Sequence, residues 1–399
     1  MNMPHHASLS ERRSLEPQIL NAAAPRAELE ARLQMFRNQL KESEVDVAVI
    51  TAPYSVFYLS GIWTGFFASS PFIIIAQKTY AVIARRLDLA WQEVWSPQSW
   101  AGEWSSYRDE DDVADVVGRI VRKHYASARN SLGLELNTPR VSERFAARLS
   151  VFAEAHKVID LQPSMIALRS VKSSTELTHM KRSSVITVRG IEAARDSIAG
   201  GATDSASAAA AFTAMIEAGS EPLAHTPVVV SGPSNRFTHL PWAGVRPLDG
   251  EPTTMMLGAL VKGYAAPLER TFFKHHIPSV ARDMLCSVAE AIEVTMSQLR
   301  PGMTGAEVDR LARSVHEKNG WADRFLHRTG YSTGINWADL DLMQLHPSEA
   351  ATVAPGMTFH LVPHLVDDEL GLLAISQPIV VTEHGCEPLL EFPLIVDAI

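Results

Sequence analysis

The sequence predicts an α+β protein with two domains, in which an N-terminal α/β domain is followed by a curved antiparallel sheet with helices on one face. Three observations predict this fold class. The 399 residues exceed the usual size of one core but are few for three domains. The first part of the chain alternates amphipathic helices with short β-branched or aromatic runs. The second part has helices followed by a block of strand-like segments.

The N-terminal domain, residues 1–165, is expected to alternate helices and strands. Apolar residues recur at helical spacing in residues 26–44, and amphipathic patterns return at 111–124 and 141–155. Short β-branched or aromatic runs predict strands at residues 46–50, 57–59, 72–76, 81–84 and 131–135. Turn residues between positions 161 and 169 then predict the boundary with the second domain.

The C-terminal domain, residues 166–399, is expected to place helices before strands. Helical patterns occupy residues 174–197, 204–218, 281–299 and 304–318. The last helix follows a Pro-Gly pair, and Thr304 and Glu307 have the spacing of a capping box. Strand-like segments occupy residues 226–230, 253–260, 271–273 and much of the tail from position 358. This order favours helices packed on one face of an antiparallel sheet.

Composition describes an ordinary globular protein and limits its partners. Hydrophobic residues make up 46% of the chain and charged residues 20%, which suffices for a large core. The 36 Lys and Arg against 45 Asp and Glu give a net charge of −9. Such a chain lacks the positive field that attracts nucleic-acid phosphates or anionic lipids. A small-molecule partner is therefore expected, with no nucleic acid and no membrane.

Neither the N-terminal segment nor the cysteines indicate export. Residues 1–13 are polar and lack the apolar stretch of a signal peptide. Residues 51–76 carry no charge and are long enough to cross a bilayer, but proline and glycine interrupt them, which favours buried strands around a loop. Cys286 and Cys386 are not spaced as a metal or redox pair. We therefore expect reduced thiols and a cytoplasmic protein.

Reactive side chains gather in four segments of the second domain. These are the turn-rich loop that ends in His239, the strand-like segment with Glu269, the glycine-rich loop with His327 and Tyr331, and the pair His360 and His364 around Pro363. Each has an ordinary structural interpretation, such as an ion pair between Glu269 and Arg270. On a strand, residues four apart are separated by ~13 Å, so the two histidines around Pro363 are too far apart to share one ion.

These segments belong to a longer series of motifs with a fixed order. The series is SGP at 231–233, His239, a glycine-containing stretch at 258–264, ERTF at 269–272, HRTG at 327–330, PGM at 355–357 and TEHG at 382–385. The order resembles the pita-bread superfamily, which includes methionine aminopeptidases, aminopeptidase P, prolidase and creatinase. FYLSG at 57–61 and LRSVK at 168–172 resemble the creatinase–prolidase branch. The resemblance covers nearly the whole chain and implies a creatinase-like α/β domain followed by a pita-bread domain.

The departures from this superfamily concern its dinuclear metal site, which uses two Asp, one His and two Glu. The corresponding positions here hold Met256, Pro267, Tyr331, Val362 and Ser376. Methionine and valine cannot act as hard oxygen ligands, and proline has no side-chain donor. The resemblance, with all five ligands replaced, implies a member with no metal and no cofactor.

The resemblance also implies which residues react. Creatinase is a metal-free member that hydrolyses a guanidinium carbon with a loop histidine and a carboxylate, and the matching residues here are His239 and Glu269. A peptide carbonyl is a weak electrophile that the peptidases activate with metal, whereas an amidinium carbon already carries positive charge. We therefore expect Glu269 to act as nucleophile or as base on water. His239 is expected to move protons to the departing nitrogen.

Aromatic and imidazole side chains near this pair favour a pocket for a ring-shaped cation. The predicted substrate-binding residues are Tyr331, His327, His360, Trp63 and Trp242. The whole sequence resembles the ectoine hydrolases, which open a cyclic amidine to N-acetyl-diaminobutyrate. This resemblance implies a zwitterionic substrate, ectoine or its hydroxylated form. Its carboxylate would be bound by Arg236, Arg246 or Arg328, among which the sequence does not choose.

In the creatinase branch, the loop after FYLSG reaches into the pocket of the partner subunit. The matching loop here is residues 62–67. The resemblance therefore implies a homodimer in which Trp63 or Phe66 caps the neighbouring site. Three alternatives stay open: a creatinase-like guanidine hydrolase, a non-catalytic binding protein built on a peptidase fold, and a true metallopeptidase.

Overall fold

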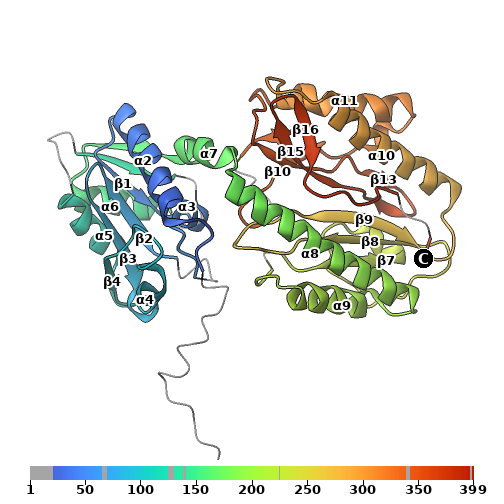
Figure 1. Ribbon diagram of the computed structural model, residues 1–399, viewed down its shortest axis with the longest axis horizontal. Coiled ribbons are helices and arrows are strands. Elements are labelled where there is room, and N and C mark those ends of the chain that lie inside the picture. The colour runs from blue at the N-terminus through green and yellow to red at the C-terminus, as the bar shows by residue number, and fades with distance from the viewer. Residues whose placement is uncertain are drawn as a thin grey trace, which may run out of the picture. The chain divides into compact units, whose positions relative to one another are not determined.

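The computed structural model describes residues 21–64, 70–124, 130–136, 138, 141–223, 225–337, 342–395 and 398–399. The chain forms two compact units, Met1–Met165 and Ile166–Ile399. The colour in Figure 1 runs from blue to green through the first unit and from green to red through the second.

The N-terminal unit contains one mixed sheet with the strand order β4-β3-β2-β1-β5-β6. The strands are β1 (Val47–Ile50), β2 (Phe72–Ala76), β3 (Tyr80–Arg85), β4 (Trp104–Tyr107), β5 (Ser131–Leu134) and β6 (Lys157–Asp160). The central strand β1 pairs antiparallel with β2 and parallel with β5. Parallel pairs need crossover connections, and helices supply them here.

Helices complete the predicted α/β arrangement of this unit. They are α2 (Arg26–Glu42), α3 (Pro53–Ser60), α4 (Trp91–Trp95), α5 (Val113–Arg122), α6 (Glu143–Ala153) and, at the boundary, α7 (Gln162–Ser170). The side chains of Asp112 and Ser142 accept hydrogen bonds from the first turns of α5 and α6 and so fix where both helices begin. The two helices bury Val117 and Leu149 against strand residues such as Val49.

Two sequence predictions in this region are wrong. Residues 57–59 lie in the helix α3, not in a strand, and residues 162–170 form the helix α7, not a turn-rich link. In α3, Pro53 occupies the first turn and Gly61 closes the helix with a φ of 74°. The residues between are buried on every side, so apolar periodicity could not distinguish a short helix from a buried strand.

The C-terminal unit is built from antiparallel strands. One sheet has the order β7-β8-β9, a second has the order β11-β10-β12-β15-β16, and β13 pairs with β14. The strands are β7 (Val228–Ser231), β8 (Pro252–Leu257), β9 (Leu268–Phe273), β10 (Gly330–Ser332), β11 (Gln344–Leu345), β12 (Thr358–Leu361), β13 (Leu365–Asp367), β14 (Gly371–Leu373), β15 (Gln377–Thr382) and β16 (Gly385–Pro388). An antiparallel bridge between Arg270 and Ile375 joins β9 to the segment before β15.

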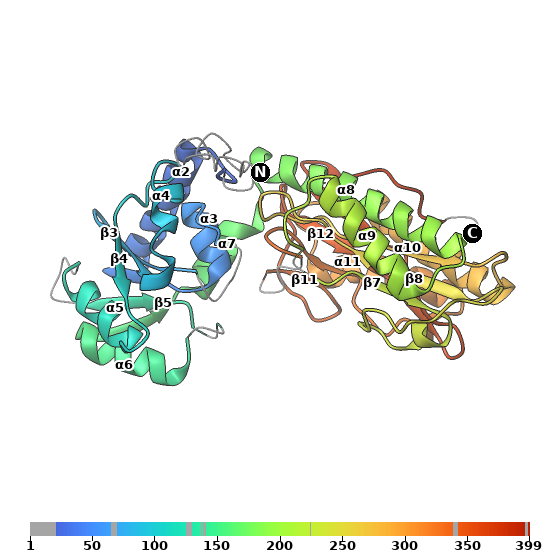
Figure 2. The same ribbon diagram turned by 90° about the horizontal axis from the view of Figure 1, so that it is seen from below.

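Two pairs of helices cover these sheets and create two hydrophobic cores. The helices are α8 (Ser174–Ala199), α9 (Asp204–Glu217), α10 (Ser279–Gln298) and α11 (Gly305–Lys318). Figures 1 and 2 show α8 beside α9, and this pair buries Ile191 and Met215 against Met255 of β8. The other pair packs Val288 of α10 against Phe359 of β12. The predicted fold class is confirmed.

The predicted capping box at Thr304 and Glu307 is also present at the start of α11. In the part of the chain that the structure describes, no helix has the length and apolar character needed to cross a membrane.

Candidate active site

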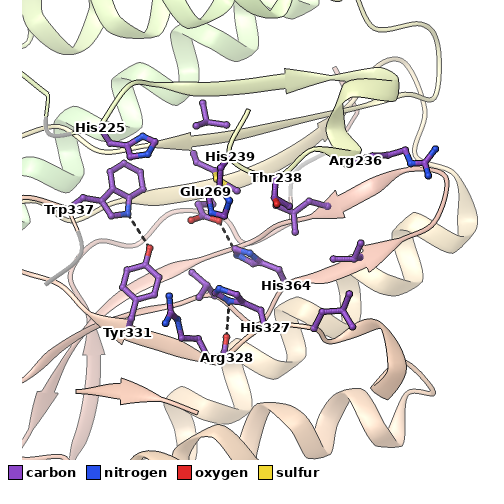
Figure 3. Close-up of a pocket in the computed structure, with 16 residues that line it drawn as sticks. His225, Arg236, Thr238, His239, Glu269, His327, Arg328, Tyr331, Trp337 and His364 are labelled. Atoms are coloured by element: carbon purple, nitrogen blue, oxygen red, sulfur yellow. Dashed lines mark hydrogen bonds and ion pairs between the residues drawn. The ribbon is translucent and has the colours of Figure 1, made fainter. Parts of the chain in front are cut away.

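A cavity of about 550 Å³ lies in the C-terminal unit, between β8 and β9 on one side and the segments around residues 327–331 and 362–366 on the other. Figure 3 shows its side chains. Its wall is largely apolar with a few converging polar groups, as in ordinary small-molecule sites. The lining residues are His225, Val228, Arg236, Thr238, His239, Met256, Glu269, Leu326, His327, Arg328, Tyr331, Trp337, Val362, His364, Val366 and Leu372.

The structure brings four of the seven predicted site residues together in this cavity, namely Glu269, His239, Tyr331 and His327. His360 lies behind the wall and contacts Tyr331. Trp242 lies outside the wall, is 42% exposed, and lines a separate pocket beside Phe212 and Leu223. Trp63 lies in the N-terminal unit with its ring edge-on to Phe57, and residues 65–67 of the predicted capping loop, Phe66 among them, are outside the described residues.

Glu269 is the single carboxylate among the described residues that line the cavity. It lies on β9, directly opposite Met256 of β8, and its side chain is 6% exposed. Its Oε2 atom is buried and has no hydrogen-bond partner of good geometry, while Nε2 of His364 lies 3.1 Å away (Figure 3). Burial raises the pKa of Glu269 to about 8, although the neighbouring Arg270 acts in the opposite direction. At neutral pH the isolated site therefore holds a carboxylic acid.

A buried chain of hydrogen bonds runs from the cavity wall into the sheet. Nε1–H of Trp337 donates to the hydroxyl oxygen of Tyr331 over 3.1 Å, and that hydroxyl lies 2.8 Å from Nδ1 of His360. Nε2 of His360 lies 2.6 Å from the hydroxyl of Ser376, which also accepts the main-chain N–H of Glu269 over 2.7 Å. Burial lowers the pKa of His360 to about 3, so the ring is neutral. With Tyr331 donating to Nδ1 and Nε2–H donating to Ser376, both ring nitrogens of His360 have a partner.

Two of the three candidate arginines line the cavity, and Arg246 does not. Arg236 is exposed at the end of a short 3₁₀ turn after β7. Arg328 is half-buried: Nη1 donates to Oε1 of Gln344, and the guanidinium lies 5.3 Å from the centre of the Tyr331 ring. Nε of Arg328 is buried with no hydrogen-bond partner. A buried cationic donor without an acceptor is costly unless a ligand supplies one.

The loop that carries His239 is fixed by one buried carboxylate. Asp204, fully buried at the start of α9, accepts the main-chain N–H groups of Gly244 and Val245 over 2.7 and 3.1 Å. Its Oδ2 also lies 3.4 Å from the main-chain nitrogen of Ser231, so both ends of the loop meet at this side chain. His239 itself has a φ of 69°, which is uncommon for a residue with a Cβ and needs such support.

A second buried carboxylate positions the opposite wall. Asp309 accepts hydrogen bonds from the main-chain nitrogen and the hydroxyl of Thr329 over 3.0 and 2.8 Å, and pairs with Arg313 at 2.9 Å. This arrangement fixes the chain that carries His327, whose ring lies nearly parallel to that of His364 with centres 6.2 Å apart. The cavity thus has imidazoles on several sides of its one carboxylate.

Two family models cover nearly all of this chain. The Creatinase/Prolidase N-terminal domain model matches residues 32–171, and the model of Metallopeptidase family M24 matches residues 178–383. The chain belongs to family M24. This finding confirms the predicted family and places the chain among hydrolases and peptidases.

Several M24-like relatives match over almost their whole length. The ectoine hydrolase of Halomonas elongata is 25% identical over 394 residues, covering 92% of this chain and 96% of that protein. The agropine synthesis cyclase of Rhizobium rhizogenes is 26% identical with the same coverage, and the Xaa-Pro dipeptidase of Pyrococcus furiosus is 23% identical, covering 90% of this chain and 98% of that protein. The prolidase structure from Pyrococcus horikoshii matches with a TM-score of 0.80 at 20% identity, covering 92% of this chain and all of that one, which shows the shared fold.

Membership of M24 raises the question of whether these residues could hold a metal. Of the five positions predicted to have lost ligands, Met256 and Val362 present apolar groups to the cavity, and Tyr331 and Ser376 are engaged in the buried hydrogen-bond chain. Pro267 offers no side-chain donor. Among the described residues, no three His, Cys, Asp or Glu side chains are close enough to hold one ion. The donor set does not fit a dinuclear centre.

Sequence reasoning did not identify His225 and Thr238 as lining residues, and left the role of His364 open. His364 follows the end of β12, where its own N–H bonds back to the carbonyl of Val362 over 2.8 Å. This tight turn directs it toward Glu269, whereas His360 within the strand contacts Ser376. The sequence signal that could have indicated this turn is Pro363, because proline favours the end of a strand.

Proposed function

We propose that this chain is a metal-independent hydrolase that opens the ring of a zwitterionic cyclic amidine, with ectoine as the model substrate. One observation supports it above the others. Two buried polar atoms without partners, Oε2 of Glu269 and Nε of Arg328, belong to side chains that line the same cavity. Oε2 of Glu269 suits a cationic N–H group, and Nε of Arg328 suits a carboxylate. A ligand that carries an amidinium and a carboxylate would therefore give each atom a partner.

The electrostatics of the cavity favour an amidinium over a peptide. A peptide carbonyl requires strong polarisation, which M24 relatives could obtain from metal ions, but the donor set here does not suit them. An amidinium carbon is already electron-poor and needs only a carboxylate and a proton carrier. The flat ring of Trp337 and the apolar side chains of Met256 and Val362 suit the carbon faces of such a ring.

In this reaction Glu269 acts either as nucleophile or as base. In the water route, the water oxygen bonds to the amidine carbon, Glu269 takes a water proton, and the C=N electron pair returns to nitrogen. The C–N bond then breaks, its electron pair leaves with the amine nitrogen, and a carbonyl forms. His239, exposed at the cavity mouth, carries the proton from the oxygen of the intermediate to that nitrogen.

Relatives lend support to this choice without deciding it. The ectoine hydrolase of Halomonas elongata aligns with nearly the whole chain, but so does the Xaa-Pro dipeptidase of Pyrococcus furiosus, at a similar identity. The replaced ligand positions favour the amidine hydrolase, because a metal-dependent dipeptidase would need ligand side chains at those positions.

A direct assay tests the proposal. Purified protein is incubated with ectoine, and the open-chain product is followed by NMR with and without a strong chelator. Parallel samples contain creatine, or a Xaa-Pro dipeptide with added Mn²⁺. We expect ectoine turnover that the chelator leaves unchanged, and none of the dipeptide. Turnover that the chelator abolishes, or preferential cleavage of creatine or the dipeptide, would contradict the proposal.

A further inference from the structure

The side chains of Glu269 and His364 form a buried contact between a carboxyl group and an imidazole. Oε2 of Glu269 lies 3.1 Å from Nε2 of His364, and the two side chains are 6% and 7% exposed. Neither atom has a hydrogen-bond partner of good geometry, so the contact is one of proximity that a small rotation of either side chain would align for proton transfer. Two isolated buried charges would be strongly disfavoured here, but an acid and a base in contact can remain neutral overall by exchanging one proton.

The surroundings set the resting position of that proton. His364 faces the imidazoles of His327, His360 and His316, and burial together with these neighbours moves its pKa well below 6.5. The adjacent Arg270 acts on Glu269 through its charge and lowers the pKa of the carboxyl group, while its Nη1 donates to the main-chain carbonyls of Glu269 and Ser376. The charge of Glu269 in turn raises the pKa of the Tyr331 hydroxyl. The resting pair is therefore carboxylic acid and neutral imidazole.

A carboxylic acid is neither a base nor a nucleophile, so the resting site needs a way to lose the proton of Glu269. A bound amidinium supplies the driving force because its positive charge favours the carboxylate. The acceptor must lie within hydrogen-bond distance of Oε2. Among the described residues, His364 is the titratable side chain found there.

We propose that His364 is the proton acceptor that converts Glu269 into its reactive carboxylate when the cationic substrate binds. The proposal rests on the proposed function. The O–H bond of Glu269 breaks, its electron pair stays on Oε2, and the lone pair of Nε2 of His364 forms the new N–H bond. After the ring opens, the imidazolium gives this proton to the released amine, which leaves as an ammonium group. His239 has a separate task, because it moves protons within the intermediate.

Infrared spectroscopy tests the proton transfer without requiring turnover. At neutral pH the resting protein should show a carboxylic-acid C=O band that is absent from Glu269→Gln. Addition of acetamidinium chloride, a cation that cannot undergo ring opening, should remove the band in the wild type. The band should persist in His364→Gln and His364→Asn, because Glu269 has lost its acceptor. Loss of the band in these two variants, or persistence in the wild type, would overturn the proposal.

Kinetics supply a second readout and separate this proposal from the proposed function. For ectoine, His364→Gln should lower kcat about 100-fold or more with little change in KM, in line with the loss of one proton-transfer group. Its kcat should rise with pH, because Glu269 must then lose its proton to solvent. Wild-type kcat in a folded His364→Gln protein would refute the role of His364. Absence of ectoine turnover in the wild type, with the infrared result intact, would refute only the substrate.

Discussion

Tyr331 and His360 lie directly opposite each other on β10 and β12, and the Tyr331 hydroxyl is 2.8 Å from Nδ1 of the imidazole. Both side chains are buried, and Tyr331 occupies one of the positions where the resemblance predicts a metal ligand. The hydroxyl also accepts the indole N–H of Trp337. One hydroxyl thereby bonds two nitrogen atoms, one of them on the fully buried His360.

Tyr331→Phe should destabilise the protein because it leaves both nitrogen atoms without a partner. We expect a loss of about 1–3 kcal/mol in the free energy of unfolding, measured with urea. Trp337→Phe provides the control. The double variant should lose less unfolding free energy than the sum of the losses in the two single variants, and the difference, the coupling energy, should be about 1 kcal/mol. Strict additivity would show that this hydrogen bond contributes nothing.

Glu269 should make the stability of the wild type depend on pH in a defined direction. Its pKa is raised by burial from 4.5 to about 8, so between these values the folded state binds more protons than the unfolded state. The free energy of unfolding should therefore fall as pH rises from about 4.5, and level off above 8, by an amount on the order of 5 kcal/mol.

Glu269→Gln isolates this effect, because other groups titrate in the same range. Burial lowers the pKa of His360, so His360 reduces stability as pH falls below 6.5 in both proteins. The difference in unfolding free energy between variant and wild type should grow in favour of the variant from pH 5 to pH 8. A constant difference would mean that Glu269 titrates normally.

The same Glu269→Gln variant should also lose ectoine turnover by about 100-fold or more.

The architecture could be predicted from sequence because its signals are local. The helix of residues 304–318 has its own capping box, and the alternation of strands and helices in the first unit gives the α/β order. The error at residues 57–59 arose where no local signal exists, since α3 is short and buried on all sides. That Met256 and Val362 stand at the family's ligand positions remains a prediction from motif order, although both side chains do line the cavity.

Contacts between distant residues could not be predicted in this way. Glu269 and His364 are 95 positions apart, and their contact depends on a turn at Pro363 that no periodicity specifies. Trp242 belongs to the same loop as His239 but turns away from the cavity, because Asp204 holds the chain just beyond it. Proximity in sequence to a reactive residue was therefore a poor guide to which aromatic groups line the site.

Asp204→Ala should disorder the loop that carries His239. The substitution removes one buried acceptor shared by several main-chain N–H groups of the loop, so we expect a loss of about 2 kcal/mol in stability and a lower kcat. Asp204→Asn keeps one acceptor oxygen and should be less affected. Limited proteolysis should cut near residues 232–245 faster in the alanine variant than in the wild type. Equal cleavage of both would show that other contacts hold the loop.

Arg328 is expected to bind the substrate carboxylate in preference to Arg236. Nε of Arg328 is buried without a partner, whereas Arg236 is exposed and free to remain hydrated. A charge-assisted hydrogen bond contributes about 1.5–3 kcal/mol, so Arg328→Gln should raise KM for ectoine roughly 10- to 100-fold. Arg236→Gln is the matched control and should raise it by a few-fold at most.

A cyclic amidine that lacks the carboxylate separates binding of this group from general damage to the site. The wild type should bind the analogue more weakly than ectoine, and Arg328→Gln should bind it as well as the wild type does. Isothermal titration with both ligands and all three proteins measures these differences. If Arg328→Gln weakens binding of the analogue as much as binding of ectoine, the guanidinium acts by supporting the cavity wall through its contacts with Tyr331 and Gln344. If Arg236→Gln shows the larger loss for ectoine alone, the carboxylate binds at the exposed mouth.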